Sequence, residues 1–295
     1  MPTERDRSSS RIWKTSLPFI SVVIPTYNRR EYLKICLDAF ARQTYPQNLY
    51  DVIVVDDGSM DDTSSFLSEY SKSTPFTLIS LRQENQGPAI ARNLGIRKAR
   101  GELVAFTDDD CVVKEDWLYN HSRSFNDDMV GGVGGVVESK VLGIYGLYFD
   151  YMGILSPLAD AETVYYIITA NACYRKDVLM KAGGFNEKIK KPGCEDPILS
   201  IKVRQMGYTL RYNPESVVWH YHKNNIKSFA RTFYNYGRGK EILDRELNWE
   251  SLPKRRRYSL VQYKKDEGGT GRAFFFLFLW YLQGIAYRLG CRKGY

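Results

Sequence analysis

Short apolar runs alternate with longer, more polar segments between residues 20 and 110. Runs of this length, rich in Val, Ile, Leu and Phe, are typical of buried strands. One intervening segment carries Leu33, Cys36, Leu37 and Phe40 at helical spacing, which predicts an amphipathic helix. The whole pattern predicts strands at residues 20–24, 52–55, 76–81 and 103–106, and helices at residues 31–43, 63–70 and 88–101.

This alternation predicts an α/β fold with a single Rossmann-like, mainly parallel sheet flanked by helices. Because the strands are apolar throughout, we expect both faces of the sheet to be covered. Ligands of such sheets bind at the carboxyl ends of the strands, where three polar clusters lie: Thr26–Asn28, Asp56–Ser59 and Asp108–Asp110. The first strand is followed by neither GxGxxG nor GxxxxGK[ST], which disfavours a nicotinamide cofactor or a P-loop.

The periodicity is weaker after residue 110. Residues 140–166 are aromatic without a clear period, and we expect a variable region there that lines a substrate site. The other elements predicted in this half are helices at residues 116–125, 176–182 and 195–206, and strands at residues 133–139, 208–212 and 216–219.

Asp108, Asp109 and Asp110 directly follow the last strand of the first half. Adjacent carboxylates repel one another, so folding alone does not favour the triplet. A divalent cation between them and a substrate diphosphate would remove that repulsion, since Mg²⁺ and Mn²⁺ bind carboxylate oxygens and keep positions for phosphate. The alternative is a solvated acidic turn that caps the next helix.

The formal net charge is +8, and residues 227–272 contain twelve Lys or Arg against six Asp or Glu. Such a basic segment faces nucleic acid or an anionic membrane. The apolar residues 273–282 that follow favour lipid, so we expect a membrane surface and no nucleic acid as partner. About 15 residues of helix reach about 22 Å, short of the roughly 30 Å hydrocarbon core, which predicts a surface-lying helix. A core helix or a dimer face is the alternative.

Composition and charge together suggest three parts. They are a polar tail at residues 1–18, an α/β domain at residues 19–222, and a basic and apolar helical extension at residues 223–295. Five scattered cysteines without CxxC spacing indicate reduced thiols, and the polar first residues predict no signal peptide. We therefore expect a cytoplasmic protein, peripheral on the inner face of the cell membrane.

The chain resembles the family 2 glycosyltransferases of the GT-A fold over about residues 19–222. The resemblance implies transfer of a sugar from a nucleotide-activated donor, with inversion at the anomeric carbon. The matching segments, in chain order, are Val22–Arg29 (VVIPTYNR), Val54–Ser59 (VVDDGS) with Asp61 and Thr63, Gly87–Gly95 (GPAIARNLG), Phe106–Asp110 (FTDDD), Gly183–Glu187 (GGFNE), Glu195-Asp196 and His220.

The nucleotide pocket is assigned from the first two segments. Tyr27 could offer a flat surface to the base, and the resemblance implies that Asp57 contacts the base edge, with Pro25, Thr26 and Asn28 in the same pocket. For residues 56–59 the alternative is a turn that caps the following helix, and both roles can hold at once. The resemblance also places Arg92 near the diphosphate, the alternative being a helix-surface arginine.

The same resemblance makes Asp108 and Asp110 the DxD pair. Asp110 would bind the metal, Asp108 would face the ribose or the metal, and Asp109 stays a candidate because some relatives use a shifted pair. His220 would complete a site for Mn²⁺ or Mg²⁺, with His222 as the fallback ligand.

The acidic pair lies where the family has its general base. An inverting transfer needs one carboxylate that takes the acceptor hydroxyl proton. Asp196 is assigned that role, with Glu195 orienting the acceptor or sharing the task, and an acidic helix N-terminus is the alternative. Asn186 and Pro197 depart from the family pattern without affecting this assignment.

The predicted function is transfer of a single sugar, from a UDP-type donor first and a GDP-type donor second, to a hydroxyl acceptor such as a lipid-linked or envelope glycan. There are two alternatives. A sugar nucleotidyltransferase would carry a glycine-rich, basic loop where Thr26–Asn28 lies, and a non-catalytic carbohydrate-binding scaffold would have a broken acidic pair or DxD.

Overall fold

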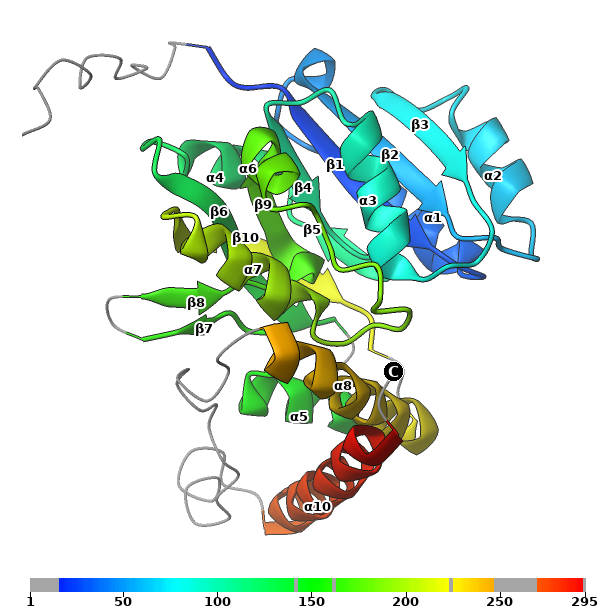
Figure 1. The fold of residues 1–295 in the computed structure, drawn as a ribbon. Coiled ribbons are helices and arrows are strands. Elements are labelled where there is room, and N and C mark those ends of the chain that lie inside the picture. Colours follow the sequence, from blue (N-terminus) through cyan, green and yellow to red (C-terminus); the bar gives the residue numbers. More distant parts are fainter. Residues whose placement is uncertain (1–15, 141–142, 161–162, 223–224, 247–269, 294–295) are drawn as a thin grey trace, which may run out of the picture.

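The chain folds around one mixed sheet of eight strands in the order β3-β2-β1-β4-β9-β6-β10-β5 (Figure 1). This computed structural model describes residues 16–140, 143–160, 163–222, 225–246 and 270–293. The basic cluster Lys254–Arg257 lies outside the described residues, as does most of the polar N-terminal tail. Helices flank the sheet, which confirms the predicted fold class.

The first half of the sheet is parallel, as predicted. β1 lies between β2 and β4, and β2 also pairs with β3. Every residue of β2 and β4 is buried, because helices cover both faces of this half. The elements are β1 (Ile20–Thr26), α1 (Arg30–Phe40), η1 (Gln47–Leu49), β2 (Tyr50–Asp56), α2 (Thr63–Tyr70), β3 (Thr77–Arg82), α3 (Pro88–Lys98) and β4 (Leu103–Phe106).

The second half of the sheet is mixed. A strand that the sequence did not predict, β9, runs antiparallel between β4 and β6, while β10 is parallel to β6 and antiparallel to β5. The elements are β5 (Cys111–Val113), α4 (Trp117–Arg123), β6 (Val130–Ser139), β9 (Ala172–Arg175), α6 (Lys176–Lys181), α7 (Glu195–Gln205) and β10 (Thr209–His220), with the short η2 (Thr169–Asn171) before β9.

The two strands predicted at residues 208–212 and 216–219 are one continuous strand, β10. Its pairing with β6 shifts register between Tyr212 and Val217, around Pro214. Proline has no N–H to donate to the ladder, so the chain bulges there without ending the strand.

Residues 140–166, expected to be a variable region, contain a regular helix and a hairpin. The helix is α5 (Ile144–Met152), and the hairpin joins β7 (Leu158–Ala159) to β8 (Val164–Tyr166). Tyr148, Phe149 and Met152 of α5 are buried in an aromatic cluster with the C-terminal helices. The helix was not predicted because its apolar side chains pack on two sides, which obscures the period.

Two long helices, α8 (Ile226–Glu246) and α10 (Thr270–Lys293), pack against each other and against α5. At about 1.5 Å per residue the 24 residues of α10 extend about 36 Å, further than the apolar run indicated. By length and composition alone, Gly271–Lys293 is the one candidate membrane span among the described helices.

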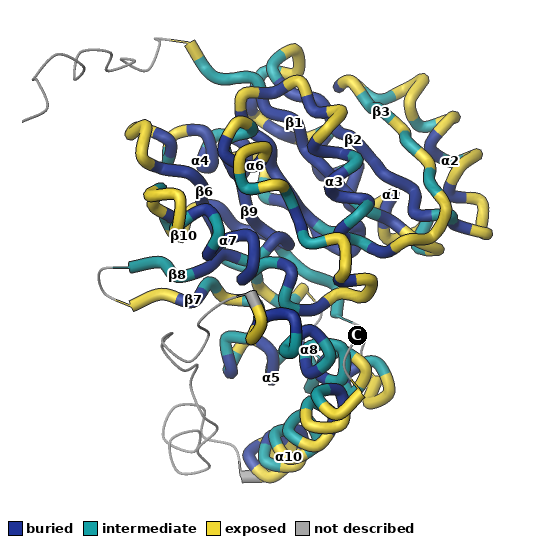
Figure 2. Tube along the Cα trace, in the orientation of Figure 1, coloured by how far each residue is buried: buried dark blue, intermediate teal, exposed yellow. Residues whose placement is uncertain are grey.

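α10 has a buried face and an exposed apolar face (Figure 2). Phe276 and Leu279 are buried against α5 and α8, which agrees with the core alternative. Five apolar residues on the other side are exposed at helical spacing: Phe274, Phe278, Tyr281, Ile285 and Leu289. An exposed apolar stripe of this kind is typical of an interaction surface.

Candidate active site

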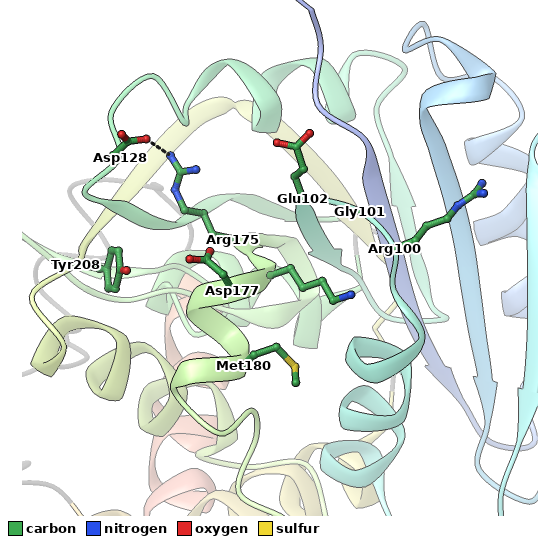
Figure 3. Close-up of a pocket in the computed structure, with 9 residues that line it drawn as sticks. Arg100, Gly101, Glu102, Asp128, Arg175, Asp177, Met180 and Tyr208 are labelled. Carbon is green, nitrogen blue, oxygen red and sulfur yellow. Dashed lines mark ion pairs between the residues drawn. The ribbon is translucent and has the colours of Figure 1, made fainter. Parts of the chain in front are cut away.

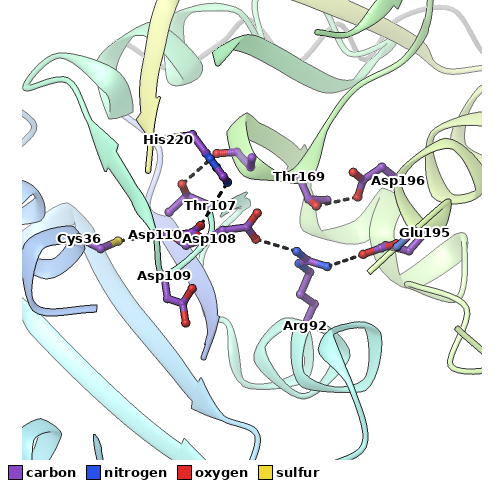
Figure 4. A network of polar contacts seen from close by, with 12 residues as sticks. Cys36, Arg92, Thr107, Asp108, Asp109, Asp110, Thr169, Glu195, Asp196 and His220 are labelled. Atoms are coloured by element: carbon purple, nitrogen blue, oxygen red, sulfur yellow. Dashed lines mark hydrogen bonds and ion pairs between the residues drawn. The ribbon is translucent and has the colours of Figure 1, made fainter. Parts of the chain in front are cut away.

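The acidic residues predicted from sequence meet at the carboxyl edge of the sheet. Asp108 and Asp110 follow β4, and His220 ends β10, two strands that are far apart in sequence. One ligand atom each of Asp108, Asp110, Cys111 and His220 lies within 4.8 Å of the others. The structure therefore brings the predicted DxD pair and the late histidine together (Figure 4).

These residues fit a hard divalent cation. The distance between His220 Nε2 and Asp110 Oδ1 is 3.3 Å, and His220 Nδ1 is buried without a hydrogen-bond partner within the described residues. Two carboxylates and an imidazole are the donor set that Mn²⁺ accepts. Cys111, which sequence reasoning missed, is a soft donor whose pKa is raised far above its usual range by burial, so its thiol stays protonated.

An arginine that the sequence analysis did not assign holds two members of the triplet. Arg29 Nη1 donates to Asp109 Oδ1 at 2.9 Å and to Asp110 Oδ2 at 2.6 Å. Thr26 Oγ1 donates to the second oxygen of Asp109 at 2.7 Å. Both oxygens of Asp109 are thus bonded inside the protein, whereas Asp110 turns its other oxygen toward His220.

The two carboxyl groups differ electrostatically although both are buried. Burial raises the pKa of Asp109 to about 7, with Arg29 opposing the shift and Asp110 adding to it. Burial also acts on Asp110, but attraction to His220 and Arg29 outweighs it and leaves the pKa of Asp110 below its usual value. Asp110 is therefore the member that is ready, as an anion, to bind a cation.

Arg92 joins the triplet to the acidic pair. Its Nη2 donates to Asp108 Oδ1 at 2.8 Å and its Nη1 donates to Glu195 Oε1 at 3.2 Å (Figure 4). The side chain is buried, so the reading of Arg92 as a helix-surface arginine is wrong. One buried guanidinium thus ties the carboxyl edge of β4 to the start of α7.

The acidic pair opens α7. Glu195 Oε2 accepts the Gly193 N–H at 2.5 Å, and Asp196 Oδ1 accepts the Thr169 hydroxyl at 2.6 Å. Glu195 is buried, while Asp196 keeps part of its surface accessible. Burial, with repulsion from Glu195, raises the pKa of Asp196 to about 7, near the value that makes a carboxylate an efficient general base at neutral pH.

The predicted nucleotide residues surround the ends of β1 and β2. The Asp57 carboxylate accepts the side-chain amide of Gln83 at 2.7 Å and the backbone N–H groups of Gln86 and Gly87, each at 2.9 Å. Asp57 therefore orders the loop before α3. Asp56 accepts the Ser59 N–H at 2.7 Å, so the turn of the alternative is present, while the cap residue of α2 is Asp62 and not one of residues 56–59.

In the segment after β1, Asn28 holds two loops together and Tyr27 is exposed. Asn28 has a left-handed backbone with φ of 53° and bonds the next rim loop, donating its N–H to Ser59 Oγ and accepting the Met60 N–H. Tyr27 is 41% exposed beside it, and Pro25 is half-buried. Tyr27 is thus the aromatic surface available at this edge.

His222, the fallback ligand, packs between two rings. Its ring centroid lies 4.2 Å from that of His220 and 4.8 Å from that of Phe149. Burial lowers the pKa of His222 to about 3, so its imidazole is neutral. Its place behind His220 makes it a packing partner of the proposed ligand.

The described surface includes two hollows whose positions bear on the site. The larger has a volume of about 960 Å³ and lies at the amino edge of the sheet. It is lined by both basic and acidic side chains, including Arg100, Glu102 and Arg175 (Figure 3). It is remote from the acidic residues of the candidate active site. The smaller, about 460 Å³, lies between the end of β6 and α5, where Ser139 pairs with His220. Only the smaller hollow adjoins the candidate active site.

Comparison with known proteins identifies the family. The model of glycosyl transferase family 2 matches residues 21–183, more than half of the chain. The chain is 31% identical over 208 residues to glycosyltransferase AglE of Haloferax volcanii, covering 70% of this chain and 68% of that protein. The chain belongs to glycosyl transferase family 2.

A second relative and a solved structure agree with the family assignment. The relative is the dolichyl N-acetyl-alpha-D-glucosaminyl phosphate 3-beta-D-2,3-diacetamido-2,3-dideoxy-beta-D-glucuronosyltransferase of Methanococcus voltae, 23% identical over 77% of this chain and 74% of that protein. Mannosyltransferase PcManGT from Pyrobaculum calidifontis, solved with GDP-Man and Mn²⁺, has a TM-score of 0.67 at 23% identity, over 95% of this chain and 77% of that one.

These likenesses confirm three predictions. The chain is a family 2 glycosyltransferase, its fold is GT-A, and its activity is transfer of a sugar from a nucleotide-sugar donor. They decide against the nucleotidyltransferase and the non-catalytic scaffold. The individual site residues rest on the geometry above.

Proposed function

We propose that this family 2 glycosyltransferase moves a single sugar from a nucleotide-diphosphate sugar to a hydroxyl acceptor, with inversion and with a divalent cation. The observation that carries the proposal is the Arg92 bridge. It fixes a cation-binding cluster and an acidic pair in one buried network, at 2.8 Å from Asp108 and 3.2 Å from Glu195. A donor site and a base site are thus held at a constant relative position.

Asp108, Asp110 and His220 would hold Mn²⁺ or Mg²⁺. The ion, when bound, offsets the charge that develops on the departing nucleoside diphosphate. Asp57, Pro25, Thr26, Tyr27 and Asn28 form the edge where the base and ribose would lie. Asp109 supports this edge indirectly, because its carboxylate oxygens accept hydrogen bonds from Arg29 and Thr26 and hold both side chains in place.

Asp196 is the proposed general base. Its carboxylate takes the acceptor hydroxyl proton as the acceptor oxygen bonds to the anomeric carbon, and the bond from that carbon to the phosphate oxygen breaks with its electron pair on the diphosphate. One base and one attack give inversion. Thr169 fixes the carboxylate through its 2.6 Å hydrogen bond, and Glu195 is the orienting partner.

The acceptor would enter through the smaller hollow. Glu138, Asp150 and Ser156 give it hydrogen-bonding groups and Phe149 gives it an apolar wall, a mixture that fits a sugar with hydroxyl groups. A lipid-linked acceptor is supported by the exposed apolar face of α10 and by the dolichyl-linked substrate in the name of the Methanococcus voltae relative. We place the enzyme in the cytoplasm, peripheral on the inner face of the cell membrane.

A donor screen tests this function. The protein is incubated with Mn²⁺ and a panel of UDP-, GDP- and TDP-sugars, and release of the nucleoside diphosphate is measured. We expect release from one nucleotide class, with UDP as the first expectation, and loss of release in excess chelator. Release from none of the sugars, with or without glycoside acceptors, would contradict the proposed activity.

A further inference from the structure

Helix α8 lies outside residues 21–183, yet its backbone touches the segment that leads into the acidic pair. A Cβ placed on Gly239 would lie 2.6 Å from the carbonyl oxygen of Gly193 and 3.0 Å from Cys194 Sγ. The Cys194 thiol donates to the Tyr236 carbonyl at 3.5 Å. At Gly193 and Gly239 the backbones of the two segments are therefore in direct contact, with the Cys194 side chain beside them.

The segment that α8 contacts controls the acidic pair directly. Cys194 has a left-handed φ of 68°, a conformation that a non-glycine residue keeps only where its surroundings enforce it. The next residue back, Gly193, donates its N–H to the Glu195 carboxylate. A shift of α8 would therefore move the backbone that holds Glu195 and begins α7.

Apolar packing supports the same contact. Ile242 and Leu243 of α8 form a buried cluster with Ile198 and Ile201 of α7 and with Ile189 of the loop before it. Because buried apolar groups are close-packed, a displacement of α8 would be transmitted to α7 through this cluster.

α10 in turn fixes α8. A Cβ on Gly237 would lie 2.0 Å from the Tyr287 carbonyl oxygen, and one on Gly290 would lie 2.0 Å from the Tyr234 carbonyl oxygen. The two helices thus cross with their backbones in contact at both glycines. Further along, Phe276 of α10 packs with Phe229 of α8 in the aromatic cluster.

We propose that α8, held by α10, is a brace that positions Glu195 and Asp196 for proton transfer, with Gly239 and Cys194 as the positioning residues. The inference rests on the proposed role of Asp196 as general base. A base must lie about 2.6–3.2 Å from the proton it takes, and a misplacement of about 1 Å can reduce the rate about 10²-fold. Donor binding should depend little on the brace, because Asp57, Asp108 and Asp110 follow strands of the parallel half and only His220 of the proposed donor site comes from the other half.

The test is the substitution Gly239→Ala, whose methyl group displaces α8 from Gly193 and Cys194. The matched control is Gly284→Ala in α10, where an added Cβ meets only Arg288 Nη2 at 3.9 Å. We expect turnover of the nucleotide sugar found in the screen to fall about 10- to 100-fold in Gly239→Ala. Affinity for UDP with Mn²⁺, measured by calorimetry, should stay within about twofold, and the control should match the parent in both.

A second variant covers the case in which Gly239→Ala does not fold. Cys194→Gly removes no large buried group and fits the left-handed backbone, but it frees the chain directly before Glu195. We expect a smaller loss of turnover, about 3- to 10-fold, at unchanged UDP affinity. A merely structural role would lower UDP affinity and turnover together, and that result would overturn the brace, as would unchanged turnover in a folded variant. Absence of turnover in the parent protein is a different outcome, which contradicts the proposed function itself.

Discussion

The parallel half of the sheet and the C-terminal half hold their functional residues in different ways. In the parallel half, Asp57 accepts three hydrogen bonds from one nearby loop, and Asp109 is held by Thr26 and Arg29 at the adjacent strand end. In the C-terminal half, Asp196 and Glu195 are held by Thr169, Gly193 and Arg92, and their loop is pressed against α8. The donor side is thus held by loops and strand ends within the parallel half, whereas the base side also depends on contact with the C-terminal helix α8.

This difference separates two requirements of sugar transfer. Binding a nucleotide diphosphate needs a fixed edge of the sheet, which short strands and loops can provide alone. Proton transfer from the acceptor hydroxyl needs one carboxylate that is held at a fixed position relative to the bound acceptor. Arg92 and His220 connect the two halves. Arg92 of α3 bonds both Asp108 and Glu195 of α7, and His220 of β10 approaches Asp110. The predictions below separate the halves experimentally.

Asp196→Asn should give the largest effect on the base side. An amide cannot take the acceptor proton, so turnover should fall about 10²- to 10⁴-fold. UDP affinity in Mn²⁺ should stay near that of the parent, because no donor contact is removed. Turnover and UDP affinity are measured on the same preparation, with the exposed Asp177→Asn as the control. If affinity collapses and turnover per bound donor stays normal, Asp196 is a binding or structural residue.

Asp110→Asn should instead impair metal binding and, with it, binding of the nucleotide donor. Losing the anionic ligand removes several kcal/mol of charge stabilisation, equivalent to about a 10³-fold loss of metal-stimulated turnover. Unlike the Asp196 variant, it should also weaken UDP binding in Mn²⁺. Calorimetry and donor hydrolysis are compared with Asp62→Asn, an exposed carboxylate near the same edge. Retained Mn²⁺ stimulation in Asp110→Asn would place the ion elsewhere.

The dependence of turnover on pH should reflect the titration of Asp196, the proposed general base. Since the pKa of Asp196 is raised to about 7 and only its deprotonated form takes a proton, turnover with saturating donor should fall about tenfold per pH unit below 7 and level off above it. Asp196→Asn should lack this limb. UDP affinity is measured across the same pH range as the control. A limb near pH 4, the ordinary value of a carboxyl group, would show that the site does not raise the pKa.

The smallest effect on catalysis is expected at the outer face of α10. Phe278 is 47% exposed and Tyr281 is 57% exposed, so replacing both with serine should leave folding and donor hydrolysis unchanged. Co-sedimentation with vesicles containing anionic lipid should fall several-fold, because burial of apolar area in the interface is lost. Met60→Ser, at an exposed apolar residue of the parallel half, is the matched control. Unchanged vesicle binding, or a change in oligomeric state, would make this face a protein contact.

Much of the parallel half was predictable from sequence. Strands buried on both faces are apolar throughout, so residues 20–24 and 103–106 were recognisable, and the polar residues after them mark the edge. Antiparallel β9 was missed because four residues between two helical turns carry no period. Arg29 was missed because the pairing of a cation with a distant carboxylate depends on the fold, although its place directly after a strand end was a signal.

The C-terminal half was less predictable for a physical reason. α5 and α10 present aromatic side chains to partners in other helices that are distant in sequence, so no single face is polar and the helical period is weak. The core-helix alternative for α10 agrees with its buried face, and the membrane-surface helix stays a prediction for its exposed apolar face. The contact of Gly239 with Gly193 could not be predicted from the local sequence, in which only the two glycines themselves are visible.

The most direct test of the account is calorimetric titration of the parent protein with UDP in the presence and absence of Mn²⁺. If Asp108, Asp110 and His220 hold the ion that the diphosphate contacts, UDP should bind at least about tenfold more tightly with Mn²⁺, a difference of about 1.4 kcal/mol or more. Equal affinity with and without Mn²⁺ would contradict the metal-dependent donor site.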